Sequence, residues 1–302
     1  MRLTGHELCW DPSVLILNFH RIESPTGLEI TRIAPARFCR LLQMIEHSGL
    51  TAAKPGDDPL SVGNQVVLTF DDGFSSVARN ALPELRRRGW GAVVFLIAAS
   101  IGTTDDWDVR LLGRRRMMMN WDDIYEWSAA GIEFGSHTMT HSDLTALSDS
   151  ALTAELGDSK GMLENKLGNP VRFLSYPFGR HDARVRQAAR EAGYDAAFAT
   201  GGTTWDHGDR YVISRINVSA LTSLFEFRTI LRAAANSGRG EGQMRPRWRN
   251  RFFESLNAGS AAVGSWRRAR RSRPQARDHM DPVNNPAGNT NNRNVTGTAG
   301  LR

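Results

Sequence analysis

Two adjacent carboxylates, Asp71 and Asp72, come directly after the apolar run of residues 66–70. A short apolar run between turn residues is typical of a buried strand. Carboxylates are costly to bury unless they are paired, hydrogen-bonded or bound to a metal. We therefore expect both at the carboxyl end of this strand, where α/β folds place their sites. Gly73 follows, and because an Asp-Gly pair also favours a tight turn, this stretch alone leaves a purely structural turn open.

Two histidines four residues apart, His137 and His141, come after a second short run at 131–135. This spacing brings two imidazoles together on one face of a helix, and a single loop turn can do the same. Imidazole nitrogen and carboxylate oxygen together suit zinc and similar divalent metals. A lone histidine pair is more often a surface or capping pair. Together with the two aspartates, however, the pair provides three metal ligands and one further carboxylate. Three protein ligands are typical of a catalytic metal site.

The elements that must position these residues alternate along the chain. Apolar residues at helical spacing predict helices over 35–47, 77–88, 120–130, 148–167, 183–192 and 221–234. Short apolar runs predict strands at 14–19, 66–70, 92–99, 131–136, 171–175, 196–199 and 212–218. This alternation predicts an α/β fold with a mainly parallel sheet, and the pattern does not separate an open sheet from a barrel.

Three short motifs, in order along the chain, resemble those of one known family. They are 69–73 (Thr-Phe-Asp-Asp-Gly), 137–141 (His-Thr-Met-Thr-His) and 175–179 (Ser-Tyr-Pro-Phe-Gly). Through them the chain is similar to the polysaccharide deacetylases, the NodB-homology domain of carbohydrate esterase family 4, from about residue 14 to about residue 235. The resemblance implies a distorted (β/α) barrel of about seven strands.

The resemblance also implies a role for each motif. Asp71 would be the general base, and the metal ligands would be Asp72, His137 and His141, with Zn²⁺ as the expected divalent ion. Spacing alone leaves open which aspartate is the base and which the ligand. Because consecutive strand residues point to opposite sides, a bend must bring both carboxylates into one cleft. The main-chain N–H of Phe178 would help to hold the oxyanion.

One departure from the family pattern concerns an arginine. Many relatives have an arginine at the position of Ser175, where it orients the catalytic aspartate. We predict that Arg215, in the stretch Ser-Arg-Ile-Asn at 214–217, takes this role instead. The alternative is that Arg215 forms a salt bridge elsewhere.

A second departure concerns the general acid, because the late Leu-x-His motif that supplies it is missing. Residues 17–22 (Leu-Asn-Phe-His-Arg-Ile) resemble instead the N-terminal motif of the permuted poly-N-acetylglucosamine deacetylase branch. This second resemblance implies that His20 protonates the leaving amine. His181 and His207, both in expected loops, are the rival donors.

Aromatic side chains near these motifs are the predicted sugar contacts. They are Tyr176 and Phe178 of the third motif and Trp205 in the polar loop 203–209, near the place where a fourth family motif carries a tryptophan. Each can equally be a packing residue.

Taken together, these features predict a metal-dependent hydrolase that removes acetyl groups from an N-acetylated sugar in a poly- or oligosaccharide. An O-acetyl esterase that acts on a glycan through the same site is one alternative, and a non-catalytic glycan-binding protein is another. The expected partner is an N-acetylated glycan or a lipid-linked sugar.

The basic charge of the chain belongs to its C-terminal part. Of the 302 residues, those from 238 onward hold 13 Arg and 4 acidic residues, a net charge of +9, whereas residues 1–237 have a net charge of −3. We therefore divide the chain into a deacetylase domain, 1–237, and an Arg/Gly/Asn-rich tail, 238–302, whose composition is typical of disorder. Such a tail contacts anionic surfaces only weakly, and we expect no nucleic acid partner.

The sequence gives no sign of a targeting segment. Residues 1–10 contain His6 and Glu7 and no apolar segment of the kind found in signal peptides, and no run approaches the ~20 apolar residues of a membrane span. A cytoplasmic location is therefore expected, and export by another route stays open.

Overall fold

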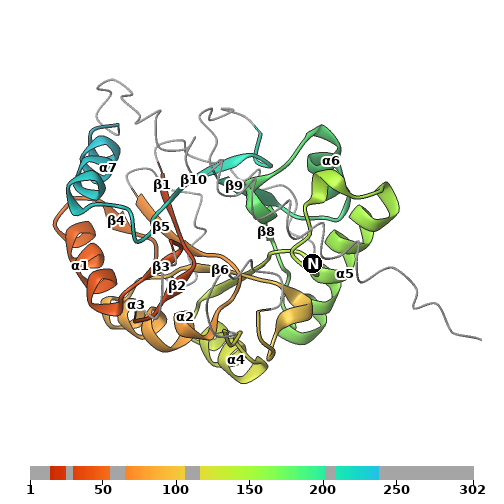
Figure 1. The fold of residues 1–302 in the computed structure, drawn as a ribbon, viewed down its shortest axis with the longest axis horizontal. Coiled ribbons are helices and arrows are strands. Elements are labelled where there is room, and N and C mark those ends of the chain that lie inside the picture. Colours follow the sequence, from red (N-terminus) through yellow and green to blue (C-terminus); the bar gives the residue numbers. More distant parts are fainter. Residues whose placement is uncertain (1–13, 25–29, 55–64, 106–115, 201–208, 238–302) are drawn as a thin grey trace, which may run out of the picture.

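Seven strands close into a parallel barrel in the computed structural model, which describes residues 14–24, 30–54, 65–105, 116–200 and 209–237 (Figure 1). In their order around the barrel they are β1 (Leu15–Phe19), β10 (Ile213–Asn217), β9 (Ala196–Thr200), β8 (Phe173–Ser175), β7 (Glu133–Ser136), β6 (Val93–Leu96) and β5 (Gln65–Phe70). The pairing of β1 with β5 closes the ring. The barrel expected from the resemblance is therefore confirmed.

Three short strands lie outside this ring. The strand β4 (Thr51–Ala52) pairs with the beginning of β5, and β2 (Arg21–Ile22) pairs with β3 (Arg32–Ile33). Because β2 begins two residues after β1 ends, this small pair lies at the same end of the barrel as the carboxyl end of β1.

Helices surround the barrel (Figure 1). They are α1 (Pro35–Glu46), α2 (Ser75–Asn80), α3 (Leu82–Arg88), α4 (Trp121–Ala129), α5 (Asp149–Leu167), α6 (Ala183–Glu191) and α7 (Leu224–Ser237), with the short 3₁₀ helices η1 (Ala98–Ser100), η2 (Leu144–Ala146) and η3 (Pro177–Gly179). Side chains fix several helix ends. Asn120 and Asp123 form a capping box at the start of α4, and Ser148 caps α5, which ends at the left-handed Gly168.

The helix predicted over residues 77–88 is wrong in one respect, because it is two helices. The chain breaks at Ala81, and Pro83 lies in the first turn of α3. Inside a continuous helix Pro83 would lack a hydrogen-bond donor and would clash with the preceding turn, whereas the first turn of a new helix tolerates it. The residues predicted to face the core, Ala78, Leu82 and Leu85, are nevertheless buried.

Alternation along the strands separates two apolar layers. On β5, Val66, Leu68 and Phe70 belong to the large core between the barrel and its helices, whereas Val67 belongs to a smaller cluster with residues of the other barrel strands. The next residue on the face of Val67 is the buried Thr69, and then Asp71. The inner face of the barrel is therefore apolar along most of its length and polar at the carboxyl end of the strands, where the site lies.

Several predictions fall outside the described residues. They concern Trp205, His207, the division of the chain at residue 237 and the tail 238–302. Among the helices of the described part, none is both long and apolar enough to cross a membrane.

Candidate active site

Asp71 lies at the carboxyl end of β5, where its neighbours fix both of its carboxylate oxygens. Arg215 donates to Oδ1 and Oδ2 through two separate nitrogens, each at 2.8 Å. Asn18, from the end of β1, donates to Oδ2 at 2.9 Å. A forked pair of this kind constrains the plane of the carboxylate as well as its position. The geometry is that of a carboxylate held in one orientation.

Arg215 reaches Asp71 from β10 and makes the contact with Asp71 that its predicted orienting role would require. Its guanidinium lies over the rings of Phe95 and Phe198, with centroid distances of 5.2 and 5.7 Å. It also donates to the hydroxyl of Ser175 at 2.7 Å. The short serine on β8 therefore leaves room for an arginine that comes from another strand.

The pKa of Asp71 lies below its usual range. Burial is the largest single effect and would raise the pKa, but the charges of Arg215, His137 and His20, together with the hydrogen bonds from Arg215, outweigh it. The carboxylate is therefore ionised at neutral pH.

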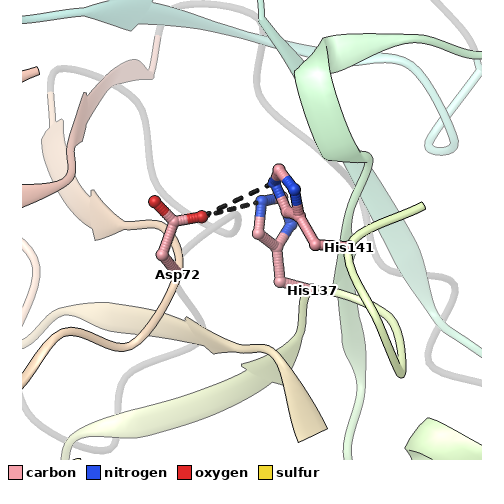
Figure 2. Close-up of side chains that lie close together, drawn as sticks. All are labelled: Asp72, His137 and His141. Carbon is pink, nitrogen blue, oxygen red and sulfur yellow. Dashed lines mark ion pairs between the residues drawn. The ribbon is translucent and has the colours of Figure 1, made fainter. Parts of the chain in front are cut away.

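Asp72 faces the two histidines rather than Arg215. Its Oδ1 lies 3.5 Å from Nε2 of His137 and 3.6 Å from Nε2 of His141 (Figure 2). All three side chains are buried, and one ligand atom from each lies within 4.8 Å of the others. Figure 2 shows the carboxylate and both imidazoles pointing toward the same point. The structure thus separates the two aspartates that spacing alone could not tell apart.

This cluster fits a divalent metal. The Nδ1 atom of His137 lies 2.7 Å from the carbonyl oxygen of Ser175, so Nδ1 carries the proton and Nε2 presents its lone pair toward Asp72. Burial lowers the pKa of His137, which keeps the imidazole neutral, as metal ligation requires. Two imidazoles and a carboxylate form a donor set that suits Zn²⁺ and related ions, so these residues would hold such an ion.

Left-handed backbone conformations bring these groups together. Among the described residues four non-glycine residues have a positive φ, namely Asp72 (72°), Thr138 (67°), His141 (60°) and Phe178 (60°). All four belong to the motifs of the site. The turn at Asp72 is the bend that allows consecutive carboxylates to face one cleft. Because such conformations cost on the order of 1–3 kcal/mol each, the surrounding structure must hold them in place.

The third motif forms the tight turn η3 beside the histidines. Phe178 is part-buried, and its ring packs edge-on against His141 with centroids 4.6 Å apart. Gly179 has a φ of +68° and lies so close to β9 that a β-carbon would meet the main chain of Thr200 at 2.5 Å. Glycine is therefore required here both for its conformation and for the close approach.

We expect Gly179→Ala to lower both stability and activity. The methyl group would push the turn away from Thr200 and displace Phe178, which contacts His141. Gly168→Ala is the matched control, because Gly168 has a similar φ of +69° but nothing within 4 Å of the added carbon. The control should lose about 1–2 kcal/mol from backbone strain alone, measured by urea unfolding, and should keep its activity. Equal losses in the two variants would mean that the contact with Thr200 is unimportant.

His20, the predicted acid, follows the last residue of β1. It is part-buried, and desolvation lowers its pKa to about 4 although the Asp71 charge acts in the opposite direction. At neutral pH the imidazole of the resting protein is therefore uncharged. It lies close enough to Asp71 and His137 for their charges to influence it.

The structure does not support a sugar contact for Tyr176. Its side chain is 1% exposed, and its hydroxyl donates to the carbonyl of Tyr211 at 3.0 Å. The ring lies against His181, with centroids 5.2 Å apart. Tyr176 is thus a packing residue of the outer core, the alternative that the sequence left open.

Sequence reasoning missed the contribution of Asn18. Its amide donates to Asp71 and to Asn217, and its oxygen accepts from Arg215 and from Thr69. The available signal was a polar residue at an inward position of an otherwise apolar strand. Asn18 is 0% exposed, and a fully buried amide requires partners.

Fold and site together form a (β/α) barrel in which a positioned carboxylate lies beside three side chains that could hold a metal ion. Residues 61–197 match the family model for polysaccharide deacetylase. Through these 137 of its 302 residues the chain is similar to the polysaccharide deacetylases, a class of hydrolases.

Two curated relatives agree with this assignment. YxkH of Bacillus subtilis, assigned to the polysaccharide deacetylases, is 27% identical over 213 residues, which are 68% of this chain and 71% of the relative. The poly-β-1,6-N-acetyl-D-glucosamine N-deacetylase of Staphylococcus epidermidis is 30% identical over 168 residues, which are 51% of this chain and 54% of that protein.

Solved structures share the fold. The structure of IcaB from Ammonifex degensii has a TM-score of 0.61 at 22% identity and covers 73% of this chain and 97% of its own. The Streptococcus pyogenes deacetylase PplD, solved in complex with acetate, has a TM-score of 0.62 at 21% identity and covers 72% of this chain and 97% of its own.

Proposed function

We propose that this protein hydrolyses the acetamide group of an N-acetylated sugar in a poly- or oligosaccharide, with a divalent metal held by Asp72, His137 and His141. The observation that carries the proposal is the difference in contacts between the two adjacent aspartates. Asp71 is ionised and held by Arg215, whereas Asp72 faces the imidazoles. A binding protein without catalysis would need neither arrangement.

In the proposed reaction water adds to the carbonyl carbon and the C–N bond breaks, giving acetate and a free amine. Asp71 accepts the proton of the attacking water, and its fixed plane directs the accepting oxygen. The N–H of Phe178 donates to the oxygen that becomes negative, in a turn preorganised by Gly179. A divalent cation of this kind, when bound, lowers the pKa of water and polarises the carbonyl.

His20 supplies the proton that the leaving amine requires. Because its pKa is about 4 in the resting protein, His20 is neutral at first, and it takes up the proton that Asp71 has accepted from the attacking water, which leaves Asp71 charged again. The nearby Asp71 charge favours the protonated form, which then donates to the amide nitrogen. An unprotonated amine is a poor leaving group, so this step decides whether the bond breaks.

The proposal is tested by acetate release from the purified protein with Zn²⁺. The first substrate is poly-β-1,6-N-acetylglucosamine oligomers, because the Staphylococcus epidermidis relative is named for this polymer. Chitin oligomers, a lipid-linked N-acetylated sugar and an O-acetylated glycan complete the panel. Release from the O-acetylated glycan alone would favour the esterase alternative. No release from any of them would contradict catalysis on acetylated glycans.

We expect His20→Gln to lower kcat about 10²–10⁴-fold, because the variant lacks the proton donor. Zinc content should equal that of the wild type, since His20 is not a ligand. Kinetics on the best substrate, with metal analysis of the same samples, provide the measurement. His181→Gln is the control, because the His181 ring packs against the buried Tyr176. Near-wild-type turnover in His20→Gln would contradict the donor role.

The same variant should change how stability depends on pH. The pKa of His20 falls from 6.5 to about 4 on folding, so between these values the unfolded chain binds more protons than the folded protein. The wild type should therefore lose up to about 3 kcal/mol from this group as the pH falls from 6.5 to 4. Metal-free His20→Gln should show a smaller loss in urea unfolding, because the contribution of His137 is common to both proteins.

A further inference from the structure

Glu155, on α5, holds the turn between the two metal-binding histidines. Its Oε2 accepts the main-chain N–H of Met139 at 3.0 Å and that of Thr140 at 2.9 Å. Its Oε1 accepts the hydroxyl of Thr140. One carboxylate therefore binds three donors on two of the three residues that separate His137 from His141.

The opposite side of this turn is held as well. Ala98 donates its N–H to the carbonyl of Thr138 at 3.1 Å, and Ala99 donates to the carbonyl of Met139 at 3.0 Å. These donors come from η1, which follows β6. The turn is thus fixed between η1, which binds its carbonyl groups, and Glu155, which binds its N–H groups.

Such a turn needs external support, because its own conformation is unfavourable. Thr138 and His141 both have a left-handed φ, and neither is glycine. Within the turn, the Ser136 hydroxyl accepts the N–H of Thr138, and the Thr138 hydroxyl accepts the N–H of His141, each at 3.1 Å. Met139 and Thr140 lie between Thr138 and His141, and their N–H groups donate to Glu155. Without the carboxylate, the segment would be free to relax toward ordinary backbone angles and to move His141 away from Asp72.

We propose that Glu155 is a positioning residue for the metal site: through the main chain of residues 139 and 140 it sets the distance between His137 and His141. The inference rests on the proposed metal site of these histidines with Asp72. Groups that orient metal ligands typically change metal affinity about 10–100-fold when they are removed. We expect a loss of this size in Glu155→Ala.

A second glutamate on the same helix provides a matched control. Glu164 also accepts a main-chain N–H from outside the helix, that of Val171, at 2.9 Å. It lies near the other end of α5, and its second partner is Lys160 on the same helix. Loss of Glu164 therefore removes a comparable helix-to-loop contact at a place remote from the histidines.

The experiment measures the affinity of the full chain for Zn²⁺ alone, by competition with a chromophoric chelator. Glu155→Ala should bind Zn²⁺ about 10–100-fold more weakly than the wild type, and Glu164→Ala within about twofold of it. Glu155→Gln should recover most of the affinity, because the amide oxygen still accepts both N–H groups. Glu155→Asp, with a shorter side chain, should lie in between and replaces Glu155→Ala if that variant does not fold.

Two results would overturn the inference alone. One is an affinity of Glu155→Ala or Glu155→Asp within about threefold of the wild type, and the other is an equal loss in Glu164→Ala, which would mean a general loss of stability. The variant His141→Ala separates this failure from failure of the metal site. If His141→Ala binds Zn²⁺ as the wild type does, the proposed metal site is wrong, and the inference falls with it.

Discussion

Replacing Arg215 by methionine is expected to lower the free energy of unfolding by about 3–5 kcal/mol at pH 7. The side chain of Arg215 is 0% exposed and that of Asp71 5% exposed, so water cannot replace the lost partner. Methionine would leave an ionised carboxylate buried in front of Phe95 and Phe198. Urea unfolding at pH 7 is the measurement.

Two further variants identify the cause of this loss. Asp71→Asn combined with Arg215→Met removes both charges, and it should recover a large part of the lost stability, because no unpaired charge stays buried. Arg172→Met breaks the ion pair with Asp195 between side chains that are 30% and 43% exposed, and should cost at most about 1 kcal/mol. If the double variant is as unstable as Arg215→Met, the loss comes from packing rather than from charge.

The free energy of unfolding should also depend on pH differently in the wild type and in Arg215→Met. In the wild type the pKa of Asp71 is lower in the folded protein than in the unfolded chain. The ionised carboxylate therefore stabilises the folded state at a pH above the unfolded pKa, and this stabilisation is lost as the pH falls through the folded pKa. In Arg215→Met the guanidinium is gone, and burial raises the pKa of the same carboxyl. The deficit of this variant should therefore become smaller as the pH is lowered from 7 toward 4.

Asp71→Asn and Asp72→Asn should both abolish most of the activity, but for different reasons. Asp71→Asn should retain Zn²⁺ and lose about 10²–10⁴-fold in kcat, because the proton acceptor is gone. Asp72→Asn should lose Zn²⁺ affinity, because its carboxylate faces Nε2 of both histidines. Metal analysis and acetate release on the same preparations measure both effects.

The adjacent variants serve as controls for each other, since each removes one carboxylate at the end of β5. A loss of metal in Asp71→Asn with full retention in Asp72→Asn would reverse the roles proposed for the two residues. A loss in both would mean that the strand end itself is disturbed, and circular dichroism of the two variants would show it.

Local patterns in the sequence predict the alternating strands and helices and the strand ends that carry the candidate site, whereas the barrel is implied only by the resemblance to a known family. Two predicted strands are followed directly by Asp71 and by His137. These polar side chains are therefore expected at the carboxyl ends of parallel strands. Because Ser175 departs from the family pattern, Arg215 is predicted from the sequence to orient Asp71, although 144 residues separate the two. The break at Ala81 was also readable, because Pro83 lies inside the expected helix.

Other features depend on distances that no short motif encodes. Asp72 has a left-handed backbone conformation although it is not a glycine, so its residue type does not reveal this conformation. Tertiary contacts stabilise the conformation there. Glu155 acts through main-chain groups, so neither its residue type nor its spacing marks it in the sequence. Tyr176 lies within a motif yet points into the outer core, because neighbouring strand residues face opposite sides.

The closing strand of the barrel has a consequence for the order in which the protein becomes active. β1 is synthesised first but pairs with β10, and the contact between Asn18 and Asn217 spans 199 residues. Such long-range contacts form late, because loop closure must precede them. A nascent chain that stops before residue 213 contains Asp72, His137 and His141, the three proposed metal ligands, but lacks Arg215, which holds Asp71. Pairing of β10 therefore couples completion of the barrel to the onset of the proposed catalysis.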